Sequence, residues 1–125
     1  MTMARQRLGR AAEGLVAERL QREGWGIVER NARTGSGEID LLALDGRTLV
    51  FVEVKAGRLG ARAGPERPAL AVGWRKQLKI RRLARELIAA GRIPFGVAGF
   101  RFDVVGVSYD RLGRVAEVEH IRAAF

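Results

Sequence analysis

The sequence of 125 residues contains no cysteine and a single histidine. These absences exclude a disulfide framework and argue against a zinc centre, so any bound metal would be held by oxygen ligands, as magnesium or manganese is. No apolar run approaches the roughly 18 residues that a membrane-spanning helix needs. The basic residues near the start are followed by no continuous apolar segment, as a secretory signal would require. We therefore expect a cytoplasmic protein without a membrane partner.

Acidic residues are the minority, with 14 against 23 lysines and arginines, and they are almost missing from one part of the chain. Residues 55–92 contain eleven basic side chains and two acidic ones, so this segment alone carries a net charge of +9. The rest of the chain is neutral in sum. Because a generic solubilising charge would be spread over the surface, a charge this concentrated indicates a polyanionic partner, most simply nucleic acid.

The hydrophobic periodicity predicts one α/β domain over residues 1–125, with a mixed central sheet flanked by helices. The predicted elements are, in order, a helix over 7–23, a strand over 25–30, a polar loop over 31–37, strands over 38–44 and 48–55, a long loop over 56–73, a helix over 74–90, and strands over 100–109 and 115–121. The long loop contains two of the three prolines. Loops of this length in compact domains are usually functional or mobile.

The stretch GEIDLLALDGRTLVFVEVK, residues 37–55, is predicted to be a hairpin around a two-residue turn at Asp45-Gly46. That turn predicts the pairs Leu42 with Leu49, Asp40 with Phe51, and Glu38 with Glu53. Since side chains alternate between the faces of a strand, Glu53 and Lys55 share one face. Asp40 is then expected on the same face, diagonal to Glu53 and within reach of a shared ligand.

Two carboxylates this close in a poorly solvated place repel each other and need a cation, a proton or a basic partner. A magnesium ion meets that need, and Lys55 could then orient or deprotonate a water and stabilise charge on a phosphate. The set suits phosphodiester hydrolysis. Glu13 lies against the apolar stripe of the first helix, where a direct or supporting role at the same metal would give it a partner. The alternative is a plain ion pair between Glu53 and Lys55 at a sheet edge.

Four segments resemble the YraN-type family of uncharacterised bacterial proteins. They are GEIDLLA (37–43), FVEVK (51–55), RFDVV (101–105) and HIRAAF (120–125). That family is predicted to belong to the restriction-endonuclease-like superfamily and is similar to archaeal Holliday-junction resolvases. The resemblance implies a core of αβββαβ order and dependence on Mg²⁺ or Mn²⁺.

The resemblance also implies roles for single residues. Asp40 and Glu53 would bind the metal with help from the Val54 carbonyl, Lys55 would be the catalytic lysine, and Glu13 the acid from the helix. Two positions depart from the usual pattern. Ile39 replaces the proline of the superfamily motif. Where the family often has an arginine two residues after the lysine, this chain has glycine followed by Arg58, so a phosphate contact is displaced by one residue.

Further residues are candidates for nucleic-acid binding. The set consists of Arg58, Arg62, Lys76, Gln77, Lys79 and Arg82. Gln77 could instead be a partly buried polar residue at the start of its helix. Trp74 could stack on a base or serve as a core or hinge residue. His120 is expected to be structural, and Asp103 to pair with a neighbouring arginine.

The leading hypothesis is a divalent-metal-dependent nuclease that cuts DNA, with residues 55–92 contacting the phosphate backbone. No motif for reading base sequence is evident, so recognition of shape, such as branched DNA, is expected. A non-catalytic nucleic-acid-binding module and a protein-interaction adaptor on the same fold are the alternatives. A homodimer would provide the two active sites that paired cuts require.

Overall fold

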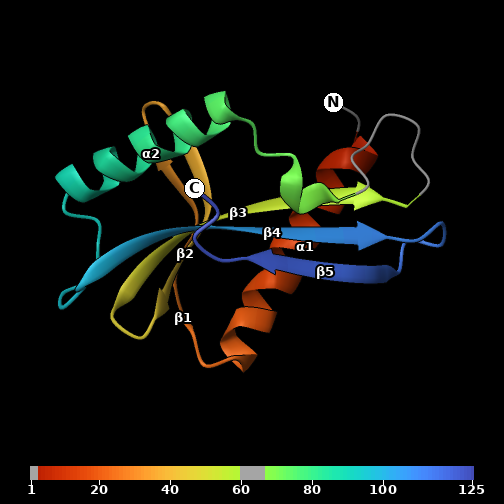
Figure 1. Ribbon diagram of the computed structural model, residues 1–125, viewed down its shortest axis with the longest axis horizontal. Coiled ribbons are helices and arrows are strands. Elements are labelled where there is room, and N and C mark those ends of the chain that lie inside the picture. Colours follow the sequence, from red (N-terminus) through yellow and green to blue (C-terminus); the bar gives the residue numbers. More distant parts are fainter. Residues whose placement is uncertain (1–2, 60–66) are drawn as a thin grey trace.

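The computed structural model describes residues 3–59 and 67–125, with side chains from residue 6 onward in the first range. Its elements, in chain order, are α1 (Met3–Arg22), β1 (Gly26–Thr34), β2 (Gly37–Asp45), β3 (Thr48–Arg58), the short 3₁₀ helix η1 (Pro68–Leu70), α2 (Trp74–Ala89), β4 (Gly99–Tyr109) and β5 (Val115–Ile121). The predicted order of helix, three strands, helix and two strands is confirmed (Figure 1).

The five strands form one mixed sheet in the order β1-β2-β3-β4-β5. Only β3 and β4 are parallel, and the other neighbours pair antiparallel. A parallel pair needs a crossover connection, which η1 and α2 provide between these two strands. The fold class is therefore the predicted mixed α/β arrangement, and it is consistent with a restriction-endonuclease-like core.

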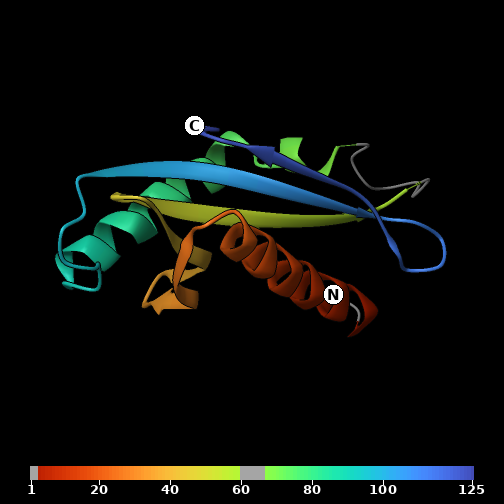
Figure 2. The ribbon, with the colours of Figure 1, turned by 90° about the horizontal axis from the view of Figure 1, so that it is seen from below.

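The two helices cover opposite faces of the sheet. Val16 and Leu20 of α1 pack with Val50 and Val52 in one core cluster, whereas Leu83 of α2 belongs to a second cluster that contains the neighbouring side chain of β3, Phe51. The alternation of β3 thus places successive side chains in different cores, as predicted. Figure 2 shows α1 below the strands, and η1 and the C-terminus above them.

The hairpin register differs from the prediction by two residues. Phe51 pairs with Leu42 rather than with Asp40, and Thr48 pairs with Asp45, so the two loop residues are Gly46 and Arg47. Gly46 has φ of +61°, which suits the first loop position of a type II′ turn. Because the shift is an even number, every side chain of β3 keeps its predicted face.

Two predicted loops are shorter in the structure. β1 extends through Asn31 to Thr34, because an edge strand with one exposed face accepts polar side chains. β3 likewise continues to Arg58, paired with β4 along its whole length, and η1 occupies part of the remaining connection. Within the described ranges, no helix has the length and hydrophobicity that crossing a membrane requires.

Candidate functional site

The regular alternation of β2 breaks at Asp40. Ile39 and Leu42 both contact the α2-side core, although strict alternation would place them on opposite faces, while Leu41 packs on the α1 side. The pairing of β2 with β3 ends at this point, since the last pair is Leu41 with Val52. The Val54 amide nitrogen, left without a β2 partner, donates instead to Asp40 Oδ2 at 2.8 Å. The bend therefore turns the Asp40 carboxylate toward β3.

Glu53 is the carboxylate that Asp40 meets there. Extending the observed register by one pair places the two residues opposite each other rather than on the predicted diagonal, and each carboxylate affects the pKa of the other. Glu53 is only 7% exposed. Burial and the neighbouring charge of Asp40 raise the pKa of Glu53 to about 7, and burial also raises the pKa of Asp40 despite the Val54 hydrogen bond.

Two lysines approach this acid pair from different elements. Lys55 Nζ lies 3.9 Å and Lys76 Nζ 3.8 Å from Glu53 Oε1. Lys55 follows Glu53 on the same face of β3, whereas Lys76 extends from the first turn of α2. Both ammonium groups favour the charged form of Glu53, yet burial and Asp40 outweigh them. Two carboxylates and two partly exposed ammonium groups thus meet at the end of the β2–β3 pairing.

Glu13 joins the site from α1, on the other side of the sheet. Its Oε2 accepts a 3.4 Å hydrogen bond from the side-chain amide of Asn31, which lies on β1 across from Asp40. Burial raises the pKa of Glu13, and the charges of Asp40 and then Glu38 raise it further. Glu13 of α1 and Asp40 of β2 are therefore close enough for the charge of Asp40 to raise the pKa of Glu13.

Asn31 is a site residue that the sequence analysis missed, because it was placed in a loop. Its φ of 54° lies in the left-handed region, which asparagine tolerates better than most residues. β1 continues through Asn31, which lies across from the position where β2 bends. An asparagine at the border of a strand pattern and a polar stretch is the one signal that could have found it.

The donor chemistry of this site fits a hard cation in part. Asp40 and Glu53 offer adjacent carboxylate oxygens, and magnesium in proteins is commonly held by one or two carboxylates with waters completing the shell. Among residues 6–59 and 67–125, however, no group of three or more acidic or histidine side chains is gathered as a metal cluster. Glu13 is therefore placed near the acid pair but not at ligand distance from a shared ion.

Relatives of nearly the same length as the chain belong to one uncharacterised protein family. The model of the uncharacterised protein family UPF0102 matches residues 12–107. The chain belongs to this family. The UPF0102 protein of Moorella thermoacetica is 42% identical over 127 residues, covering 100% of both chains, and that of Parafrankia sp. strain EAN1pec is 48% identical over 122 residues, covering 96% of this chain and 97% of the relative.

UPF0102 is the YraN family, so the resemblance is confirmed. The matched segment includes Glu13, Asp40, Glu53 and Lys55. The UPF0102 protein of Chlorobium chlorochromatii, 44% identical over 126 residues, covers 94% of this chain and 90% of its own. The family description names no reaction, so the function must be argued from these side chains.

The described residues that were predicted to contact nucleic acid lie at the end of β3 and on α2. Arg58 is exposed at the end of β3, and Lys79 and Arg82 are exposed on α2. Arg82 forms an ion pair with Glu86 at 3.8 Å. Arg62 lies outside the described residues. Among the members that the structure describes, Lys76 is the one with an ion pair to the acid pair.

The Gln77 side chain points back toward the residues that precede α2. Its Nε2 donates to the Val72 carbonyl at 3.0 Å, and the residue is half-buried. This contact ties the first turn of α2 to the segment that follows η1. The alternative interpretation, a partly buried polar group at the helix start, accounts for that contact, and a nucleic-acid role for Gln77 stays a prediction.

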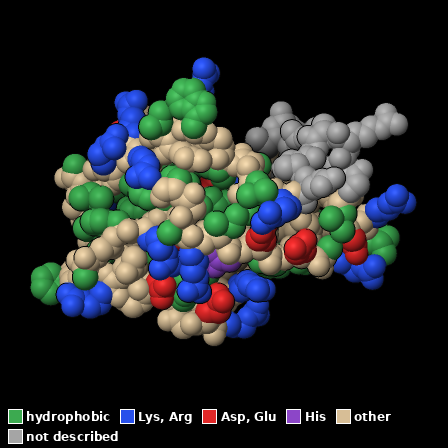
Figure 3. Space-filling view, in the orientation of Figure 1, with side chains coloured by type: hydrophobic (Ala, Val, Ile, Leu, Met, Phe, Trp, Pro, Cys, Tyr) green, Lys and Arg blue, Asp and Glu red, His purple; other side chains and the backbone are tan. Residues whose placement is uncertain are grey.

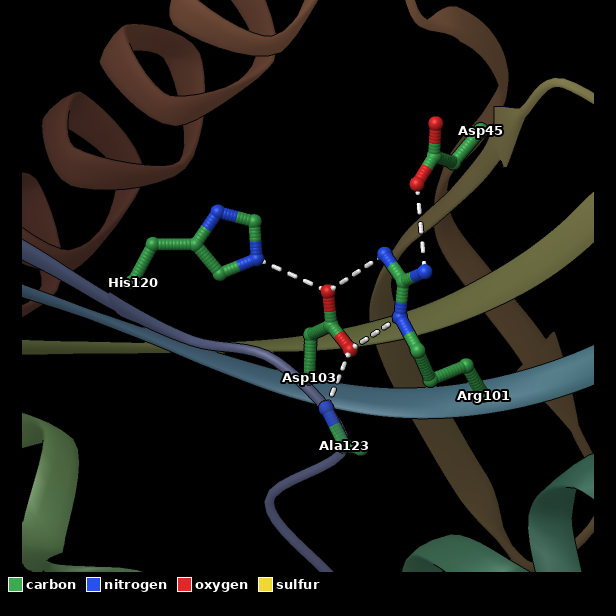
Figure 4. Close-up of polar contacts among 5 residues, drawn as sticks. All are labelled: Asp45, Arg101, Asp103, His120 and Ala123. Carbon is green, nitrogen blue, oxygen red and sulfur yellow. Dashed lines mark hydrogen bonds and ion pairs between the residues drawn. The ribbon is translucent and has the colours of Figure 1, made fainter.

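A second charged cluster lies in the sheet, on the α1 side of β4. Asp103 is fully buried and is hydrogen-bonded to Arg101 (2.8 and 3.1 Å), to His120 Nε2 (2.8 Å) and to the Ala123 amide (3.0 Å), as Figure 4 shows. Arg101 also donates to Asp45 at 3.1 Å. The predicted pairing of Asp103 with an arginine is confirmed.

The donors around Asp103 decide its charge state. Burial alone would raise the pKa of this carboxyl, but the hydrogen bonds from His120, Arg101 and the Ala123 amide outweigh it and lower the pKa to about 2. The cluster joins β4 to His120 of β5 and to Ala123, which follows that strand. His120 also packs 5.5 Å from the Trp25 ring, which agrees with the structural role expected for it.

Proposed function

We propose that this UPF0102 protein is a divalent-metal-dependent nuclease that hydrolyses phosphodiester bonds of DNA. The observation that supports the proposal is the contact between Asp40 and Glu53, two largely buried carboxylates whose pKa values are both raised. Such a pair is unfavourable for the fold, and perturbed acids of this kind are enriched at functional sites. A bound cation would relieve their repulsion.

Asp40 and Glu53 would hold Mg²⁺ or Mn²⁺ through their carboxylates. The Val54 carbonyl is a third candidate, because the N–H and C=O of a strand residue project to the same side and the Val54 N–H points to Asp40. The ion would supply Lewis-acid stabilisation of the phosphate and acidify a water. Glu13 would act on the same centre through solvent, since Asn31 restrains its carboxylate.

Lys55 has the position of a group that acts on the reacting water and phosphate. It follows the metal-binding strand segment on the same face, and its ammonium lies beside Glu53 and partly open to solvent. A cation there would orient the nucleophile and stabilise charge that develops on the phosphate oxygens. Lys76 would add a second positive charge from α2.

The DNA strand would reach this centre over a basic surface. Figure 3 shows many Lys and Arg side chains on the face that α2 and the C-terminal strands present. Arg58, Lys79 and Arg82 would contact phosphates, which position a strand without reading its sequence. Branched DNA is the expected substrate structure, and a homodimer would be needed for paired cuts in two strands.

Metal-dependent cleavage of single strands, duplexes, flaps and four-way junctions tests the proposal. We expect cutting with Mg²⁺ or Mn²⁺ and none in EDTA. Asp40→Ala should abolish cutting, and Lys55→Ala should lower its rate by roughly 10²- to 10⁴-fold, while DNA binding persists in both. Exposed residues of α1 supply the controls, Glu18→Ala and Arg19→Ala, which should cut normally.

The second candidate is a nucleic-acid-binding module without catalysis. The observation that favours it is the lack of a three-acid cluster among the described side chains. If the wild-type protein binds DNA but cuts none of these substrates with either metal, the nuclease proposal is wrong and the binding module stands. A rise in Tm with Mn²⁺ that Asp40→Ala abolishes would separately show that the acids bind metal.

A further inference from the structure

The chain has two tryptophans, and they lie in opposite environments. Trp25 is 6% exposed and packs in the α1-side core, whereas Trp74, the first residue of α2, is 65% exposed. A large apolar ring at a helix start is ordinarily buried, as the core or hinge interpretation of Trp74 assumed. A core position is therefore wrong for Trp74, since the residue is mostly exposed, and a hinge role stays a prediction.

Trp74 is part of a small apolar area. Leu78, one turn later on the same face of α2, is 57% exposed, and Leu70 of η1 is exposed as well. The guanidinium of Arg75 lies 5.2 Å from the centre of the Trp74 ring. An arginine next to an exposed indole is the combination that nucleic-acid-binding proteins use to hold an unstacked base.

The area is surrounded by positive charge. The exposed cations of α2 are Arg75, Lys79, Arg81, Arg82 and Arg85. Within residues 6–59 and 67–125, Arg75, Lys79 and Arg85 form no ion pair, so their charges are available to phosphates. Figure 3 shows Lys and Arg side chains beside hydrophobic ones along the upper edge of the molecule, where α2 lies. Charge complementarity therefore favours a polyanion over an apolar protein surface.

Trp74 belongs to the same first turn of α2 as Lys76, whose ammonium lies 3.8 Å from Glu53. Two residues apart in a helix means about 3 Å along the axis and about 200° around it, so the Trp74 side chain projects to the other side of the helix start from Lys76. The hydrogen bond from Gln77 to the Val72 carbonyl holds the start of the helix. A strand with a phosphate at Lys76 that continues over the start of α2 would place one of its following bases near the Trp74 ring.

We infer that Trp74 is a base-stacking residue, which holds an unpaired base of the DNA strand bound at the acid pair. This rests on the proposed function for the location of the strand. The substrate class is DNA with unstacked bases next to the bound phosphate, meaning single strands and the unpaired nucleotides of branches. In a continuous duplex the bases are stacked on one another, so the ring has no free base face to contact.

DNA binding of Trp74→Ala in an Asp40→Ala background, measured in EDTA, tests the inference without any cleavage. We expect affinity for single-stranded DNA to fall roughly 5- to 150-fold, as loss of one stacked base does. Affinity for an unbranched duplex should change little. Trp74→Phe should retain most of the single-strand affinity, and Phe95→Ala, which removes an exposed ring from the connection between α2 and β4, should leave it unchanged.

Fluorescence supplies a direct readout. Single-stranded DNA should quench the emission of the protein, and the quenching should vanish in Trp74→Ala, whose remaining Trp25 is buried. Equal losses for single strands and duplex, no loss for either, or concentration-dependent self-association that Trp74→Ala abolishes would each overturn the stacking role. If stacking is seen but the wild-type protein cuts nothing, the nuclease proposal fails and this inference stands.

Discussion

Two carboxylates are buried in the same sheet, and their surroundings shift their pKa values in opposite directions. Asp103 is met by an arginine, a histidine and a backbone amide, and its pKa falls to about 2. Glu53 is met by another acid, Asp40, and by two lysines at nearly 4 Å, and its pKa rises to about 7. The hydrogen bonds around Asp103 keep that carboxylate ionised. Around Glu53, burial and the repulsion from Asp40 outweigh the two lysines, and in the proposed function a bound cation relieves this repulsion.

The contrast separates a structural charge from a functional one more clearly than burial does, because both side chains are buried. A hydrogen-bonded buried ion cluster fixes which segments meet, here β4, β5 and the residues that follow β5. Two buried acids whose pKa values are raised by burial, as those of Asp40 and Glu53 are, cost free energy in the fold, a pattern that is typical of sites kept for activity rather than for stability. Replacing each carboxylate in turn tests whether the two sites differ in this way.

Asp103→Asn should have the largest effect. The amide removes the negative charge that Arg101 and His120 face, and loss of one partner of a buried ion pair costs about 3 to 5 kcal/mol. Urea denaturation at pH 7 measures this loss in the free energy of unfolding. The matched control is Asp110→Asn, which affects a more exposed ion pair with Arg114 and should cost much less.

The pH dependence gives a second check on Asp103. Its folded pKa of about 2 lies below the ordinary value of 3.8, so its stabilisation is complete above pH 4 and is lost as the pH falls toward 2. Asp103→Asn should lack that loss. Equal costs for the Asp103 and Asp110 variants would show that the cluster contributes no more than a surface pair, and the comparison would fail.

Glu53→Gln should act in the opposite direction. The folded pKa of Glu53, about 7, lies above the ordinary 4.5, so the group favours folding below pH 4.5 and this contribution is lost as the pH rises through 7. In EDTA at pH 8 the neutral amide should therefore raise the free energy of unfolding, by about 1 to 3 kcal/mol. At pH 4 the difference should vanish.

Exposed Glu18 of α1 supplies the control, since Glu18→Gln should change stability little at either pH. Mg²⁺ should stabilise the wild-type protein at pH 8 and leave Glu53→Gln nearly unchanged, because the amide is a poor ligand for a hard cation. A Glu53→Gln variant that is less stable than wild type at pH 8 would mean that the acid pair is satisfied within the fold.

Much of the fold follows from local patterns, whereas the site depends on how those elements meet. Alternation along β3 predicted which side chains share a face with Glu53, and an even shift in the turn left that result intact. Gly46 serves either position of a two-residue loop, so the register itself was not decided by the turn residues. The roles of Asn31 and Lys76 depend on the bend at Asp40 and on the start of α2, which no local pattern specifies.

Lys76→Met should have the smallest effect, and it tests whether the lysines tune the acid pair or only lie near it. Removing the Lys76 charge, which favours ionised Glu53, should raise the pKa of Glu53 by less than about one unit, because the ammonium is partly exposed. Carbon-13 NMR of the Glu53 carboxyl group measures the shift. Lys79→Met is the matched control, one turn along the same helix and without an ion pair to Glu53. Equal shifts in both variants would mean that Glu53 responds to the general positive field of α2, and that the contact with Lys76 has no specific role.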